Sequence, residues 1–368
     1  MPRGHIDLKT THRPVNIGKT CRTLYQVALP LVYREFDIAE LEHYNVLSFL
    51  RIINLRPNLA ALVHELRMID TGIYIKTEKD WRFILKEADR RGISLPHDWS
   101  PFLGEEDARY REQYNLSVGI LADLFFSTTM QIRNMSLEVN VGIKYGVFMP
   151  PLARLLSLQV LFSGFGQCQT SQTHSHLVWQ GPWDIAKAFP RLETFFLDDE
   201  WVYDDPQSLT PSSIPEALLP CTNTLRHIEI YLGRMCRSDA ELITSFKEFT
   251  ALENLLLSGN CLFRVDPDER GHDTIYQAPV PFVDLTPASV KTFGINGSFL
   301  HLCEHMLTLA REVKGGKLPR LQHLKWTGFY ESILPSGFDS LKDALRDSGV
   351  TLKLQYGDIP NLAMVGWQ

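Results

Sequence analysis

The chain has 368 residues, of which 44% are hydrophobic and 22% charged, so it can bury a large core and is not of a disordered type. Its net charge of −6 and isoelectric point near 6.1 argue against nonspecific nucleic-acid binding, and we expect no nucleic-acid partner. This length is unusual for one compact domain, but a solenoid can reach it because its core grows coil by coil.

Signals for export, membrane insertion and disulfide formation are missing from the sequence. Residues 1–30 contain no apolar signal region, and no later segment reaches the roughly 18 apolar residues of a membrane span. The cysteines are widely scattered, without a CxxC pair. We therefore expect reduced thiols, no membrane association, and a cytoplasmic or nuclear location.

Residues 17–38 begin with helical spacing. The predicted helix carries small and apolar residues on one face, namely Cys21, Leu24, Tyr25 and Ala28. Pro30 is expected to end this helix, and Leu31 begins an apolar stretch that leads to Phe36.

The same segment is similar to part of a known family. The string Cys21-Arg22-x-Leu24-Tyr25-x-x-Ala28-x-Pro30-Leu31-x-Tyr33-Arg34-Glu35 resembles the end of the F-box in many fungal F-box proteins with leucine-rich repeats. In that family the F-box binds a Skp-type adaptor of a cullin-RING ubiquitin ligase, and the repeats select the protein to be ubiquitinated. The resemblance implies adaptor contacts through Cys21, Leu24, Tyr25, Pro30 and Leu31.

The sequence departs from the family's pattern upstream of Cys21. The family's first F-box helix opens with a Leu-Pro-x-Glu signature, and residues 1–20 contain none. Residues 14–44 are therefore predicted to be either a truncated or degenerate F-box or a cap over the first coil of a repeat array, since terminal coils need such caps.

Residues 70–130 are predicted to form a helical insertion. A first helix is expected to carry Trp81, Ile84, Leu85 and Ala88 and to stop at Gly92. A second helix is expected from about residue 105 to residue 126. This enlarged coil either folds over the edge of the array or projects from it, and the pattern leaves both open.

The segment Leu252 to Leu262, LENLLLSGNCL, matches the leucine-rich-repeat pattern Leu-x-x-Leu-x-Leu-x-x-Asn-x-Leu at every position. In this pattern Leu255 and Leu257 point inward from a short strand, and the Asn260 amide bonds the backbone of a neighbouring coil. One coil cannot bury its own apolar face, so the pattern requires copies.

Copies of the strand have apolar residues at positions one, four and six of this pattern. The clear copies are Ile132/Met135/Leu137, Leu192/Phe195/Leu197, Leu225/Ile228/Ile230, Val290/Phe293/Ile295 and Leu321/Leu324/Trp326. The weaker copies are Val63/Leu66/Met68, Leu158/Leu161 with Ser163 at position six, and Leu352/Leu354 with Gly349 at position one. From Ile132 onward the copies begin on average 31 residues apart, above the typical range of about 20 to 29.

The predicted fold class is therefore α/β: an irregular leucine-rich-repeat solenoid over residues 45–368, with a parallel inner sheet and outer helices. Amphipathic linkers support the outer helices. A capping box of Ser238 and Glu241 precedes Leu242, Phe246 and Phe249, and the same spacing recurs over residues 300–310 and 338–345. The alternative is a set of unrelated buried strands in an ordinary α/β domain.

Strand alternation places positions three, five and seven of each copy on the concave face. There Phe162 and Phe196 are expected to be neighbours that anchor a partner, unless an irregular coil turns one of them inward. The predicted partner-binding residues are Phe162, Phe196, Asp198, His227, Glu229, Tyr231 and Leu256.

No motif predicts catalysis, a metal or a cofactor. Cys168 with His174 and His176 lacks a zinc spacing, and the acidic run from residue 266 fails as a calcium loop at Arg270 and Gln277. The sequence contains no P-loop, GxGxxG or GxSxG motif. We therefore expect a protein that is not an enzyme.

Together these patterns predict a protein-interaction scaffold, namely the substrate-recognition subunit of a Skp-cullin-F-box type ubiquitin ligase, with a protein of unknown identity as its substrate. The alternative is a free-standing repeat protein whose F-box remnant only caps the solenoid.

Overall fold

The structure is a computed structural model, and it describes residues 22–37, 43–68, 78–92, 124–125, 127–129, 131–140, 157–163, 190–199, 210–233, 236, 238–267, 273–275, 278–297, 302–329 and 337–356. The chain forms two compact units, one of residues 1–180 with 187–192 and one of residues 181–186 with 193–368. Each unit combines parallel strands with helices, which confirms the predicted α/β class. The predicted domain limits at 14–44 and 45–368 stay predictions. Among the described helices, none has the length and apolar character needed to cross a membrane.

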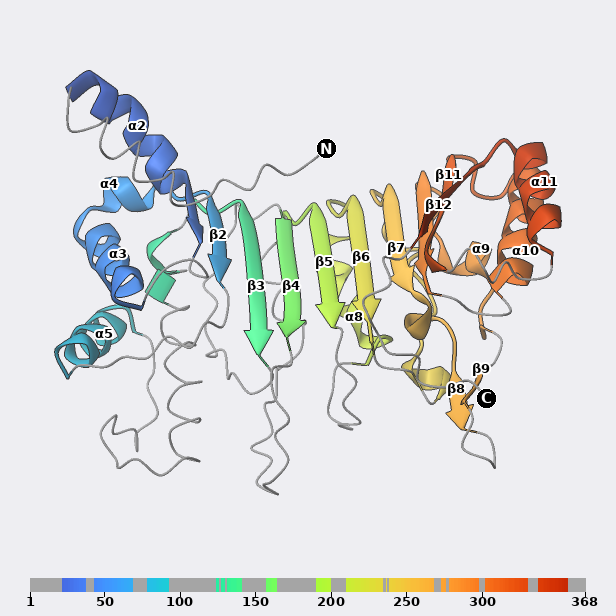
Figure 1. The fold of residues 1–368 in the computed structure, drawn as a ribbon, viewed down its shortest axis with the longest axis horizontal. Helices are drawn as coiled ribbons and strands as arrows, with labels where there is room; N and C mark the ends of the chain where they lie inside the picture. Colours follow the sequence, from blue (N-terminus) through green and yellow to red (C-terminus); the bar gives the residue numbers. More distant parts are fainter. Residues whose placement is uncertain are drawn as a thin grey trace. The chain divides into compact units, whose positions relative to one another are not determined.

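The first unit contains four parallel strands, β1 (Glu35–Asp37), β2 (Glu65–Met68), β3 (Asn134–Asn140) and β4 (Ser157–Ser163) (Figure 1). The pairing of Leu66 with Met135 confirms the predicted alignment of these two copies. Phe36 of β1 pairs with Leu66 and is buried, so the apolar stretch after Leu31 contains a further strand that the repeat pattern did not predict.

The predicted register of β4 is wrong by three residues. Leu158 pairs with Met135, and Gln159, not Phe162, pairs with Ser136 at position five. Phe162 pairs instead with Val139, so it is not at the strand position that Phe196 occupies. In this register Leu158 and Val160 occupy positions four and six, which are apolar in the clear copies, whereas the predicted register put Ser163 at position six.

The described residues of the first unit form helices α2 (Arg22–Arg34), α3 (His43–Leu55), α4 (Pro57–Ala60) and α5 (Glu78–Arg90). The prediction that Pro30 ends the first helix is wrong, since α2 continues to Arg34. Pro30 is exposed, and the helix beyond it carries Tyr33 to within 5.7 Å of the Phe49 ring on α3, measured between ring centroids. This packing offsets the one hydrogen bond that a proline removes.

The predicted helix ahead of Gly92 is confirmed as α5. Trp81, Ile84 and Ala88 are buried on one side of it, and Gly92 follows with a φ of +70°, the left-handed conformation that ends helices. Most of the second predicted helix, residues 105–126, lies outside the described residues, although residues 124–125 and 127–128 are helical.

The second unit contains the parallel strands β5 (Thr194–Asp199), β6 (His227–Leu232), β7 (Asn254–Ser258), β10 (Thr292–Asn296), β11 (His323–Phe329) and β12 (Thr351–Tyr356), paired in this order (Figure 1). A short antiparallel hairpin, β8 (Val265–Pro267) and β9 (Asp273–Ile275), follows β7. The predicted apolar positions align: Phe195, Ile228, Leu255, Phe293 and Leu324 form one buried row.

The connections of this unit hold α8 (Ser213–Leu218), α9 (Phe282–Leu285), α10 (Leu302–Lys314), α11 (Phe338–Ser348), and three 3-10 turns, Leu219–Cys221, Asp239–Glu241 and Gly259–Cys261. Helices α10 and α11 confirm two predicted linkers and pack against each other (Figure 1).

The helix predicted after Ser238 is wrong. Ser238 makes no side-chain capping bond; its hydroxyl donates instead to Glu241 Oε1 at 3.2 Å, and the 3-10 turn ends at Glu241. Phe246 is buried without a helix, and its backbone N–H donates to the Leu285 carbonyl at 2.8 Å. The apolar spacing therefore reflects burial of a nonhelical linker whose hydrogen bonds are made to neighbouring segments.

Candidate functional site

One face of the strands in the second unit is polar and only partly buried. On β6, Ile228 and Ile230 are buried, whereas His227, Glu229 and Tyr231, which alternate with them, are half-buried. The strands pair without a shift at positions three to six, and all pairs except β6 with β7 also at position seven, so these alternating residues form rows across the sheet. We call the surface formed by positions three, five and seven of β5, β6, β7, β10, β11 and β12 the polar face.

The polar face contains a hydrogen-bonded group centred on Glu229. Glu229 Oε2 lies 3.1 Å from His227 Nε2, and the Tyr231 hydroxyl donates to Glu229 Oε1. Phe196, on β5, meets the Tyr231 ring edge-on, with the ring centroids 5.8 Å apart and the planes at 61°. Asp198 pairs with Tyr231 across the strands. The Glu229 cluster is defined as these five residues, and it brings together five of the seven predicted partner-binding residues.

The cluster holds negative charge at neutral pH. Burial acts to raise the pKa of the Glu229 carboxyl, but hydrogen bonds from His227 and Tyr231 and the electrostatic influence of His227 and Lys325 outweigh burial, so this pKa lies below its ordinary value. Burial raises the pKa of the Tyr231 hydroxyl, and its hydrogen bond to Glu229 and the charges of Glu229 and Asp198 raise it further. Glu229 is therefore an ionised acceptor, and Tyr231 remains protonated as its donor.

Leu256 belongs to the polar face by register but offers little surface to a partner. It pairs with Glu229 on one side and with Gly294 on the other, and only 6% of it is exposed. The reason lies in Gly294, where an added Cβ would come within 3.0 Å of Leu256 Cγ. The Leu256 side chain thus fills the space that Gly294 leaves and forms an apolar floor.

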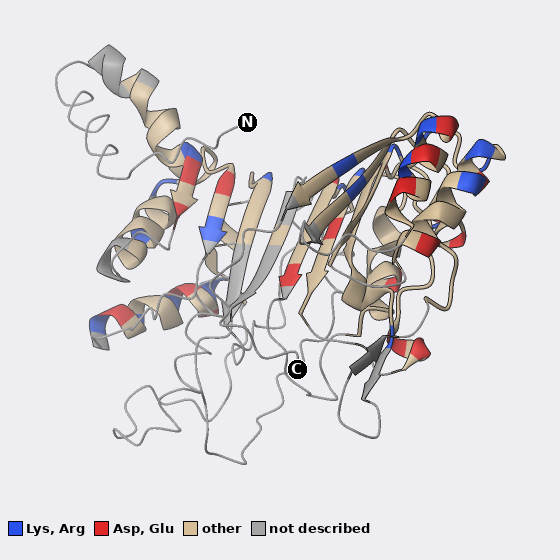
Figure 2. Cartoon of the chain, turned by 45° about the vertical axis from the view of Figure 1, so that its right-hand side comes forward, with Lys and Arg blue, Asp and Glu red and all other residues tan. Residues whose placement is uncertain are grey.

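The opposite end of the polar face is basic. Lys325 on β11 and Lys353 on β12 pair with each other at position five, in the same row as Glu229. Figure 2 shows the basic residues of these last strands in blue. The prediction did not include the two lysines, although both occupy the repeat position used to choose Phe196 and Glu229.

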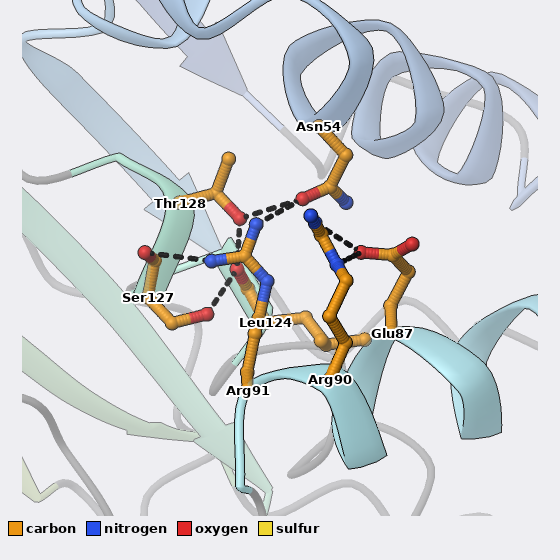
Figure 3. Close-up of polar contacts among 7 residues, drawn as sticks. All are labelled: Asn54, Glu87, Arg90, Arg91, Leu124, Ser127 and Thr128. Carbon is orange, nitrogen blue, oxygen red and sulfur yellow. Dashed lines mark hydrogen bonds and ion pairs between the residues drawn. The ribbon is translucent and has the colours of Figure 1, made fainter.

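The first unit contains a second polar group, centred on Arg91 after α5 (Figure 3). Arg91 donates to the Ser127 carbonyl at 2.9 Å and to Asn54 Oδ1, and Thr128 Oγ1 lies 3.2 Å from the same Asn54 oxygen. Burial and the neighbouring charge of Arg90 lower the pKa of Arg91, with Glu87 acting in the opposite direction. These contacts join α5, α3 and residues 124–128, so we interpret the group as structural.

The structure describes only some of the predicted adaptor-binding residues. Cys21 lies outside the described residues, as do the side chains of Leu24 and Tyr25. Pro30 and Leu31 are exposed on α2, and 66% of Leu31 is accessible. The side chain of Phe162 also lies outside the described part of the chain.

Comparison with known proteins yields no relative. No family model matches the chain, and neither a curated protein nor a solved structure is significantly similar to it. Cys168, His174 and His176 lie outside the described residues, and the described ranges contain no group of three His, Cys, Asp or Glu side chains that could hold a metal ion. The site is therefore characterised by its geometry alone, as a partly exposed face of parallel strands with aromatic, acidic and basic side chains.

Proposed function

We propose that this protein is a leucine-rich-repeat-type scaffold that binds a protein partner on the polar face. The observation that carries the proposal is a backbone contact repeated at one position of successive copies. The carbonyl of position two accepts hydrogen bonds from the next copy's two N–H groups at positions two and three, at 2.8–3.1 Å. The acceptors are His64, Glu193, Arg226, Glu253 and Lys291.

Such recurrence is typical of a solenoid, because each coil contacts only its neighbours and reuses the same bonds. Asn260 adds the side-chain bond that the repeat pattern predicts. Its Nδ2 donates to the Leu232 carbonyl at 2.8 Å and to the Gly233 carbonyl at 3.2 Å, both in the preceding coil. The recurrence at one pattern position in successive copies supports a repeat array over a set of unrelated strands.

The binding role rests on the partly exposed aromatic residues of the Glu229 cluster. Phe196 and Tyr231 are half-buried, and their rings contact each other on a strand face. Solvated aromatic side chains in contact on a surface favour its use as a binding site for a partner. Rings of this kind, surrounded by polar groups, often contribute most of the binding energy at protein interfaces.

We further propose that α2 connects the scaffold to a ubiquitin ligase through a Skp-type adaptor. The support is the F-box-like sequence together with exposed Pro30 and Leu31. A cap role for the same segment is the second candidate. It is favoured by Phe36, whose ring centroid lies 3.6 Å from that of Phe49 and 5.4 Å from that of Phe125.

The adaptor experiment is co-purification of the full chain with a Skp-type adaptor. We expect the wild type to bind and Leu31→Asp to lose binding. Leu55→Asp is the matched control, because Leu55 is 81% exposed and lies on α3, outside the F-box-like string. If the wild type does not bind, the ligase role is wrong, whereas the scaffold role is unaffected.

The scaffold experiment compares the proteins that co-purify with the wild type, Phe196→Ala and a control variant, Leu219→Ala, by quantitative mass spectrometry. Leu219 is 40% exposed and lies in a connection. A partner of the polar face should be retained by the control and depleted at least fivefold by Phe196→Ala. Equal recovery with all three proteins would contradict binding at this face.

A further inference from the structure

The formal charges of the polar face are segregated by sign. Asp198 and Glu229 lie on β5 and β6, and Lys325 and Lys353 lie on β11 and β12. The strands between them, β7 and β10, contribute only uncharged residues to positions three, five and seven, with Leu256 and Gly294 at position five. The face thus has an acidic aromatic end, an uncharged middle with Leu256 and Gly294 at position five, and a basic end.

The separation of the two ends follows from the strand order. Glu229 and Lys325 are at the same repeat position and three strand steps apart, and Lys353 is one step further. At about 4.8 Å per step, the backbone separations are about 14 Å and about 19 Å. An extended peptide that crosses the strands, rising about 3.3 Å per residue, spans these separations in about four to six residues.

The acidic end has the chemistry of a cation site. Glu229 is ionised, its side chain is 20% exposed, and Asp198 occupies the neighbouring strand. The rings of Phe196 and Tyr231 lie beside these carboxylates. An ammonium or guanidinium group gains from carboxylate contacts and from aromatic faces together.

We propose that the polar face recognises an extended peptide segment with opposite charges at its two ends. Its Arg or Lys binds at the Glu229 cluster, its Asp or Glu binds at Lys325 and Lys353, and the two are separated by about four to six residues. A small or apolar residue between them covers Leu256 and Gly294, where no charged side chain projects. This inference rests on the proposed scaffold function and defines the chemistry of its partner.

The test is selection from a display library of random twelve-residue peptides on the full chain. We expect a consensus with a basic residue and an acidic residue at that spacing. Lys325→Glu with Lys353→Glu should exchange the acidic preference for a basic one. Asp198→Asn with Glu229→Gln should reduce enrichment of the basic residue at least tenfold, without changing the acidic preference.

The control carries Lys314→Glu and Lys317→Glu, two exposed lysines at and after the end of α10. It should select the same consensus as the wild type, and circular dichroism should show that all variants remain folded. Peptides that depend on Phe196 but show no charge pair would overturn this inference and leave the scaffold role intact. So would a charge pair about nine or more residues apart, because a helix rises about 1.5 Å per residue and needs about nine to thirteen residues for these separations. If no selected peptide depends on Phe196, the scaffold role of this face is wrong as well.

Discussion

Replacing Asn260 with alanine removes the side chain that joins two neighbouring coils of the second unit. The amide donates to the carbonyls of Leu232 and Gly233 at 2.8 and 3.2 Å. Each hydrogen bond contributes on the order of 1 kcal/mol, and a buried acceptor left without a donor costs about 1–3 kcal/mol. Leu232 is 5% exposed, so water cannot readily replace the amide, and the Leu232 carbonyl keeps only a long bond from the Ser258 hydroxyl, at 3.4 Å. We expect Asn260→Ala to lower the free energy of unfolding by about 2–3 kcal/mol.

The measurement is a urea melt of the full chain followed by circular dichroism. Asn260→Asp should destabilise at least as much, although it keeps the shape, because a carboxylate has no hydrogen to donate to these carbonyls. Asn223→Ala is the control, since Asn223 is exposed and only accepts a bond from Thr250 Oγ1 at 3.1 Å. If Asn260→Ala costs no more than this control, Asn260 does not hold the coils together.

Other predictions concern the polar face. Gly294→Ala should cost about 1–3 kcal/mol in a urea melt, because the new methyl group would meet Leu256 Cγ at 3.0 Å. Adding Leu256→Ala should cost less than the sum of the single changes, and simple additivity would contradict the packing we describe. Ionised Glu229 should stabilise the fold fully above the carboxyl's unfolded pKa of 4.5, and this contribution should be lost as pH falls through its lower folded pKa. The stability difference between the wild type and Glu229→Gln should therefore shrink as pH falls below the unfolded pKa and through the lower folded one, and a constant difference would show that the carboxylate is unperturbed. Phe196→Ala should weaken a peptide selected on the wild type by at least about 1 kcal/mol in a fluorescence titration, while a stability loss near 3–5 kcal/mol would mean that the ring is a core residue.

The sequence alone predicted the inward positions of most strands, because burial in a strand follows a local period of two. Leu255 and Leu257 alternate with Leu256 and Asn254, and no long-range information is needed to separate the two faces. The same alternation predicted that Phe196, Glu229 and Tyr231 share one face, and Asn260 was assigned its backbone contact from its place in the repeat pattern.

Where local patterns allowed more than one structure, tertiary contacts selected one of them. Leu158, Val160 and Leu161 allow two strand registers, and only pairing with Met135 selects one of them. The spacing of Leu242, Phe246 and Phe249 suits a helix, yet hydrogen bonds to neighbouring segments hold these buried residues in a nonhelical linker. Leu256 is buried on the polar face only because the next strand places a glycine beside it. The contact between Leu256 and Gly294 depends on the sequences of two coils at once, so neither coil alone predicts it.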